Sequence, residues 1–110
     1  MDTNNLLIEK NILITGASNG IGKSLAINLS KFGANVIMLS KNEKALDSVY
    51  DEIKEKYNTE PMIIKCDLTD LNEIKSQEIT DIIGENYSRL DAIIHNAAIL
   101  EKMSNIENYD

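Results

Sequence analysis

Short apolar runs alternate with longer amphipathic segments along the chain, and this alternation limits the folds that it can adopt. The apolar runs cover residues 11–15, 35–40, 62–66 and 90–95. Each is rich in Ile, Leu, Val or Met and is flanked by Gly, Pro or polar residues, which is typical of a buried β-strand. Strands separated by helices favour a parallel sheet covered on both faces. We therefore expect a doubly wound α/β fold.

The first intervening segment has the periodicity of an amphipathic helix from Gly20 to Phe32. Its apolar residues fall three or four positions apart and are expected to share one buried face; they are Ile21, Leu25, Leu29 and Phe32. Gly33 follows at once, where a left-handed helix cap is expected.

The second and third intervening segments show the same periodicity. The second is expected to begin after Asn42 as an N-cap, with an apolar face made of Leu46, Val49, Tyr50, Ile53 and Tyr57. The third is expected from about Thr69 to Tyr87. Its apolar positions are Leu71, Ile74, Ile79, Ile82 and Ile83.

Length and charge limit the classes of function. The 110 residues predict one domain, residues 1–110, and the net charge of −7 argues against nucleic-acid or anionic-membrane partners, which require clustered Lys and Arg. Cys66 is the only cysteine, so no disulfide is expected within the chain. The sequence shows neither a secretory signal nor an apolar run of about 18 residues. We expect a soluble, cytoplasmic protein.

The segment TGASNGIGKS, residues 15–24, admits two interpretations as a phosphate loop. A nucleoside-triphosphate loop needs a glycine five positions before Gly22, but Ala17 stands there. A dinucleotide loop uses Gly16, Gly20 and Gly22 together, with the free N–H groups of the following helix facing the pyrophosphate. A glycine-rich turn that serves only packing is the third interpretation. The strand before and the helix after favour the dinucleotide.

Four motifs in order resemble the short-chain dehydrogenases/reductases. They are TGASNGIG at residues 15–22, SKNEK at 40–44, CDLT at 66–69 and HNAA at 95–98. The resemblance spans nearly the whole chain, but only the first half of a usual family member. It implies a Rossmann-type doubly wound parallel sheet, truncated after the fourth strand.

The resemblance also implies cofactor-binding residues. Those expected around the pyrophosphate and ribose are Gly16, Ser18, Asn19, Gly20, Ile21 and Gly22. Asp67 would accept a hydrogen bond from the adenine amino group, with Leu68 beside the ring. Asn96 and Ala97 would pass close to the adenosine ribose. The alternative for Asp67 is a helix N-cap.

The end of the second strand bears on the choice between NAD and NADP. NAD enzymes place an acidic residue there, whereas NADP enzymes offer a cation to the 2′-phosphate. This chain has Ser40 followed by Lys41, so we predict NADP over NAD, with both residues in the site. The alternative is that Lys41 is an ordinary solvated lysine; Asn19, moreover, supplies no second cation.

No catalytic residue and no metal site is expected within these residues. Family chemistry uses a Ser, a Tyr and a Lys that lie beyond the fourth strand. Tyr50 and Lys54 have the family spacing, but Tyr50 is expected to pack in the core. His95, the only histidine, is expected to be structural, and Ala98 replaces the usual glycine.

We expect the chain alone to bind NADP without turnover. Hydride transfer between NADP and a carbonyl or alcohol substrate would belong to the complete family member. A non-catalytic nucleotide-binding or regulatory module is the alternative, and a P-loop phosphotransferase a more distant one. The unpaired edge of the fourth strand makes a homo-oligomer an expected assembly.

Overall fold

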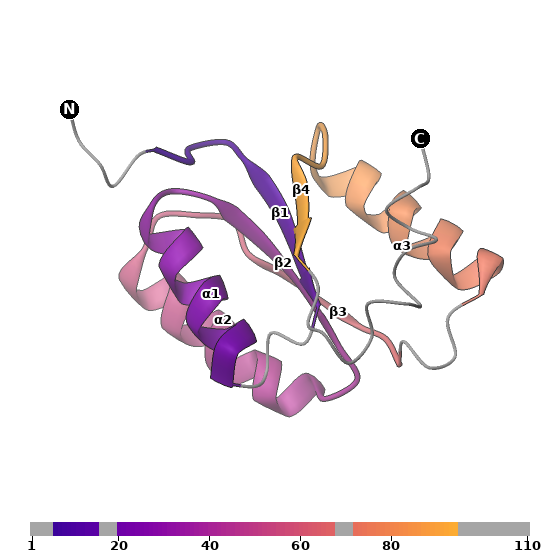
Figure 1. Cartoon of the computed structure of the whole chain (residues 1–110), viewed down its shortest axis with the longest axis horizontal. Helices are drawn as coiled ribbons and strands as arrows, with labels where there is room; N and C mark the ends of the chain where they lie inside the picture. The colour runs from indigo at the N-terminus through magenta and orange to yellow at the C-terminus, as the bar shows by residue number, and fades with distance from the viewer. Residues whose placement is uncertain (1–5, 16–19, 68–71, 95–110) are drawn as a thin grey trace.

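The computed structural model describes residues 6–15, 20–67 and 72–94, apart from the side chain of Glu43. Strands and helices alternate along these residues (Figure 1). In chain order they are β1 (Asn11–Thr15), α1 (Gly20–Lys31), β2 (Asn35–Ser40), α2 (Glu43–Lys56), β3 (Met62–Lys65), α3 (Glu73–Asn86) and β4 (Ala92–Ile94). The predicted alternation is therefore confirmed.

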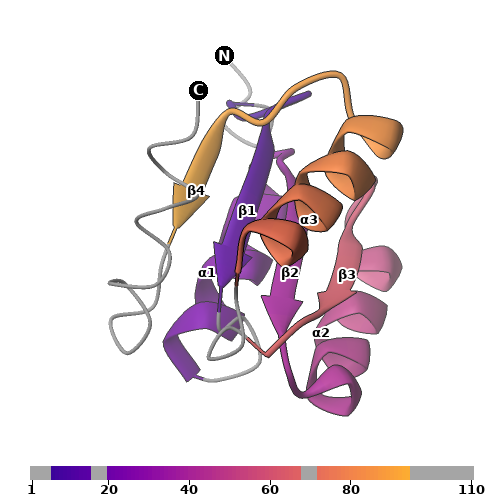
Figure 2. The ribbon, with the colours of Figure 1, turned by 90° about the vertical axis from the view of Figure 1, so that its right-hand side faces the viewer.

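The strands form one parallel sheet with the order β3-β2-β1-β4. The chain moves outward from β1 to β3 and then crosses back past β1 to reach β4. Because parallel crossovers are right-handed, this reversal places the helices on opposite faces of the sheet. Figure 2 shows α3 on one face and both α1 and α2 on the other. This is the predicted Rossmann-type, doubly wound fold.

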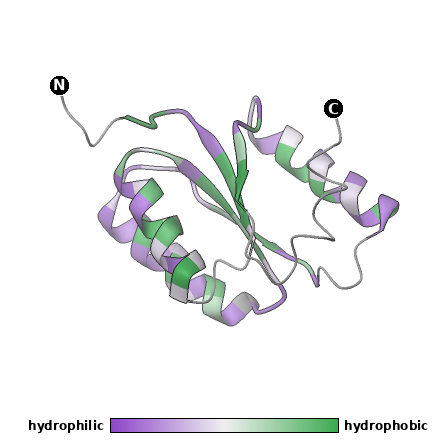
Figure 3. Cartoon of the chain, in the orientation of Figure 1, coloured by the Kyte–Doolittle hydropathy of each residue, from purple (hydrophilic) through white to green (hydrophobic). Residues whose placement is uncertain are grey.

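The two central strands supply most of the core, and both are green along much of their length in Figure 3. All of β1 is buried, as are the four inner residues of β2. Side chains from β1 and β2 alternate between the two faces of the sheet, as strand geometry requires. A strand buried on both faces cannot show a polar alternation, which explains its continuous apolar sequence.

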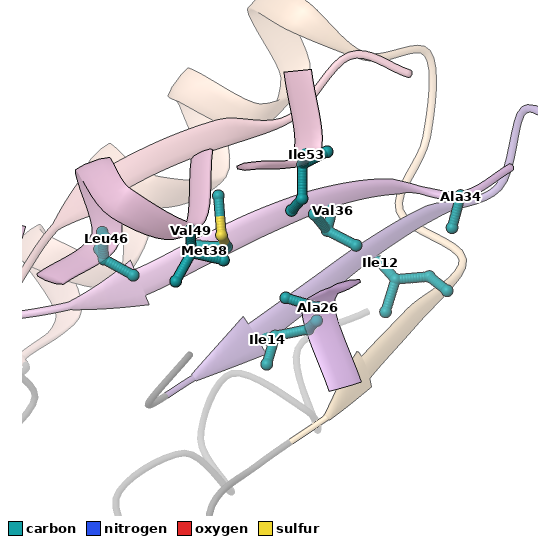
Figure 4. Close-up of a cluster of buried hydrophobic side chains, with 9 residues drawn as sticks. All are labelled: Ile12, Ile14, Ala26, Ala34, Val36, Met38, Leu46, Val49 and Ile53. Carbon is teal, nitrogen blue, oxygen red and sulfur yellow. The ribbon is translucent and has the colours of Figure 1, made fainter. Parts of the chain in front are cut away.

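Each face of the sheet has its own apolar cluster. The cluster under α1 and α2, drawn in Figure 4, contains Ile12, Ile14, Ala26, Ala34, Val36, Met38, Leu46, Val49 and Ile53. The cluster under α3 contains Leu13, Ile37, Leu39, Ile64, Cys66, Ile79 and Ile83. The first cluster is covered by two helices and the second by one among the described residues.

The face of α1 that meets the sheet differs from the prediction. Its buried residues are Gly22, Ala26 and Ser30, which are spaced four apart and therefore share one face. Ile21 is 73% exposed, so the predicted place for Ile21 on the buried face is wrong. Leu25, Leu29 and Phe32 are half-buried. Small residues make the contact between α1 and the sheet, and the larger apolar residues lie beside it. The apolar periodicity therefore indicated the flanks of this contact.

The end of α1 confirms the predicted glycine cap. Gly33 has a φ of 100°, a conformation that glycine adopts without strain. The Gly33 N–H donates to the Ser30 carbonyl at 3.0 Å, and the Ala34 N–H donates to the Leu29 carbonyl at 3.1 Å. These two bonds form a Schellman motif. The motif ends the helix and turns the chain directly into β2.

The caps of the other two helices are asparagines. Asn42 accepts a hydrogen bond from the Ala45 N–H, as predicted, and Asn72 does the same for Lys75 in α3. Helix α3 therefore begins at Glu73, later than the predicted start near Thr69. Ile79 and Ile83 are buried, but Ile74 is 71% exposed and Ile82 is 39% exposed; Leu71 lies outside the described residues. The apolar face of α3 is thus narrower than its composition indicated.

Two strand ends also differ from the prediction. Strand β3 stops at Lys65 rather than Cys66, and β4 covers only Ala92–Ile94. The predicted fourth strand included Leu90 and Asp91, which instead lead into β4. His95 lies outside the described residues.

A belt of hydrogen bonds joins the amino ends of all four strands. We call it the amino-end belt. It is made of Asn11, Asn35, Glu60, Arg89 and Asp91, together with Tyr87. The Glu60 N–H donates to Asn35 Oδ1 at 2.8 Å, and Asn35 Nδ2 donates to Asn11 Oδ1 at 3.0 Å. The Asn11 N–H donates to Asp91 Oδ2, and Asn11 Nδ2 donates to the Arg89 carbonyl, both at 2.7 Å. The belt follows the spatial order of the strands.

The belt extends to α3 through Tyr87, which follows the last helical residue. The Tyr87 hydroxyl donates to the Glu60 carbonyl at 2.8 Å. Burial, together with the nearby Glu60 carboxylate, raises the pKa of Tyr87 to about 12. At the opposite end of the belt, the Asn11 N–H and the Arg89 guanidinium hold the pKa of Asp91 below its usual value. Both shifts favour the protonation states that make the bonds.

The small-residue contact of α1 predicts a steric penalty at Ala26, which is fully buried. We expect Ala26→Leu to lower the free energy of unfolding by about 1–3 kcal/mol, because extra methyl groups force a close-packed interface apart. The control is Asn28→Leu on the exposed side of the same helix, which should change it by less than about 0.5 kcal/mol. Urea titrations measure both. Equal losses for the two variants would contradict the close contact.

The Tyr87 bond predicts a dependence of stability on alkaline pH. At pH 7 we expect Tyr87→Phe to lower the free energy of unfolding by about 0.5–1.5 kcal/mol, the range for one hydrogen bond. The folded pKa of about 12 exceeds the ordinary tyrosine pKa of 10.0, so the unfolded chain loses the phenolic proton first. The contribution is therefore complete below pH 10 and disappears as pH rises towards 12.

Urea titrations at pH 7 and pH 11 test this, with Tyr57→Phe as the matched control. The Tyr57 hydroxyl makes no hydrogen bond within the described part of the chain, so its removal should leave no pH-dependent difference. A stability gap for Tyr87→Phe that is the same at both pH values would show that the hydroxyl proton does not matter.

Candidate functional site

The candidate site lies at the carboxyl end of the sheet, where all the strands stop near the same level. Thr15 is paired in register with Leu39, Ser40 with Lys65, and Ile14 with Ile94. Ligands of open α/β sheets bind outside this end, at the point where the strand order reverses. Here the reversal falls between β1 and β4, so the sequence motifs and the topology indicate the same edge.

The end of β1 and the start of α1 form the centre of the site. Thr15 is buried, and its hydroxyl donates to the Ile94 carbonyl at 3.4 Å. This bond ties the end of β1 to the end of β4. No sequence pattern indicates this bond, apart from the presence of a threonine at a strand end.

The first turn of α1 leaves open space towards solvent. Among the described residues, nothing lies within 4 Å of a Cβ atom built on Gly20, and Ile21 is largely exposed beside it. Gly22 is buried. The first turn of α1 contains no acidic residue, so no carboxylate of that turn repels an anion near its N–H groups. Such a helix start can accept a phosphate closely.

The end of β2 carries a cation and a rigid turn. Lys41 is exposed, between two residues that are held by hydrogen bonds. Ser40 Oγ accepts from the Asn42 N–H at 3.2 Å, and the Ser40 carbonyl accepts from the Cys66 N–H at 3.0 Å. The backbone on either side of Lys41 is therefore fixed, while its ammonium group can reach an anion at this edge.

The end of β3 brings a buried thiol and an exposed carboxylate to the same edge. Cys66 is 6% exposed and belongs to the apolar cluster under α3. Asp67, the next residue, is exposed and engaged in an interaction of its own. Asp67 does not cap α3, because Asn72 does. Its carboxylate remains a candidate acceptor for an amino group of a ligand.

The chain is similar to known proteins in both sequence and structure. A model of the short chain dehydrogenase family matches residues 10–110 of the chain. The oxidoreductase YciK of Escherichia coli is 39% identical over 95 residues, which cover 86% of this chain and 38% of the relative. The chain belongs to the short-chain dehydrogenase family.

Solved structures of short-chain dehydrogenases have the same fold. A short chain dehydrogenase of Shigella flexneri, complexed with NADP, is 38% identical and superposes with a TM-score of 0.81, covering 86% of this chain and 39% of that one. One from Escherichia coli, complexed with NADPH, is 38% identical with a TM-score of 0.80, covering 86% and 39% of the two chains. The chain thus spans about two fifths of the length of these relatives.

Half of the predicted cofactor-binding residues lie in the described part of the structure. Those present at the carboxyl edge are Gly20, Ile21, Gly22, Ser40, Lys41 and Asp67. The others lie outside the described residues; they are Gly16, Ser18, Asn19, Leu68, Asn96 and Ala97. Their roles stay predictions.

Tyr50 and Lys54 lie apart from this edge, on α2. Tyr50 is half-buried and packs against the cluster under α1 and α2, so its packing role is as predicted. Lys54 lies in the last turn of α2, which runs away from the carboxyl edge that its start adjoins. No helix in the described segments of the chain is long and apolar enough to cross a membrane.

Proposed function

We propose that the chain is the nucleotide-binding part of an NADP-dependent oxidoreductase. The observation that carries this proposal is the position of Lys41, an exposed cation at the end of β2 on the same edge as the open start of α1. A pyrophosphate at α1 would direct the adenosine ribose of a dinucleotide towards the end of β2. There a 2′-phosphate gains a charge-assisted contact with Lys41 that a hydroxyl lacks.

Different residues of this edge would hold different parts of the cofactor. The α1 start, with Gly20 and Gly22, would hold the pyrophosphate, and the exposed Ile21 side chain would cover an apolar part of the cofactor. Ser40 and Lys41 would hold the ribose phosphate, and Asp67 would accept a hydrogen bond from the adenine amino group. Gly16, Ser18 and Asn19 are proposed to complete the loop, and Leu68, Asn96 and Ala97 to line the adenosine.

The NADP and NADPH complexes of the two similar dehydrogenases support this choice of cofactor. When bound, NADPH would supply a hydride to a carbonyl substrate, and NADP⁺ would accept one from an alcohol substrate. We propose that this exchange requires the longer protein, since the relatives extend well beyond the matched part. The residues described here bind and orient the nucleotide, and we propose that the chain alone binds without turnover.

The first test compares cofactors. We expect NADPH to bind at least tenfold more tightly than NADH, and ATP with magnesium not to bind. We expect Lys41→Asp to reduce the preference for NADPH by about ten- to a hundredfold, since a hydrogen bond to a charged group contributes about 1.5–3 kcal/mol. Fluorescence titration measures each dissociation constant, and Lys54→Asp on α2 is the control.

Three results would refute the proposal. The first is NADH bound as tightly as NADPH, and the second is a preference for NADPH that survives Lys41→Asp. The third is stabilisation by ATP, and not by either dinucleotide, in a thermal shift experiment, since a ligand stabilises the state that binds it.

The second test separates binding from folding at Gly20. A Cβ at this position meets no atom of the described residues within 4 Å, so Gly20→Ala should leave the melting temperature unchanged or slightly raised. The same Cβ would stand where the pyrophosphate approaches. We expect the affinities for NADPH and NADH to fall together by about tenfold, the lower part of the range for overpacking. Unchanged affinities would place the pyrophosphate elsewhere.

A further inference from the structure

We draw no further inference here: the strongest candidate, the apolar groove between α3 and the sheet that is lined by Leu13, Ile79, Ile83, Gly84 and Leu90, carries none because nothing in the described part of the structure shows what covers it.

Discussion

The amino-end belt is the constraint on which the geometry of the site depends. Its side chains join neighbouring strands in spatial order, from Glu60 through Asn35 and Asn11 to Asp91. A parallel sheet has no tight turns to fix its register, so register must be set by side chains and by packing. When the strands are aligned at one end, their other ends stop together. The candidate site is the result of that alignment.

The contact between α1 and the sheet also shapes the candidate site at the carboxyl end of the strands. Gly22, Ala26 and Ser30 let the helix lie close to the sheet, and a close helix brings its first N–H groups near the ends of β1 and β2. Apolar residues flank this contact instead of making it. Ile21 is left exposed at the edge of the candidate site.

The sequence predicted the fold and the edge of the site, but not the contacts that fix them. Strands buried on both faces, such as β2, leave a continuous apolar run that is easily recognised. Asn42 and Gly33 were predicted from local chemistry alone. The belt, by contrast, joins Asn11 to Asp91, 80 positions apart, and no local pattern indicates which asparagine will meet which partner. The start of α3 was misplaced for a similar reason, since several polar residues before it were suitable caps.

The unequal covering of the two sheet faces has a consequence for motion. Among the described residues, β1 and β2 have a neighbour on each side and helices on both faces. The three-residue β4 is held to β1 alone within the same set. Amide hydrogens exchange with solvent through local opening, and segments with fewer contacts open first. Deuterium should therefore enter β4 and α3 well before the central strands. The candidate site thus combines a rigid side, at β1 and β2, with a side that opens more often, at β4.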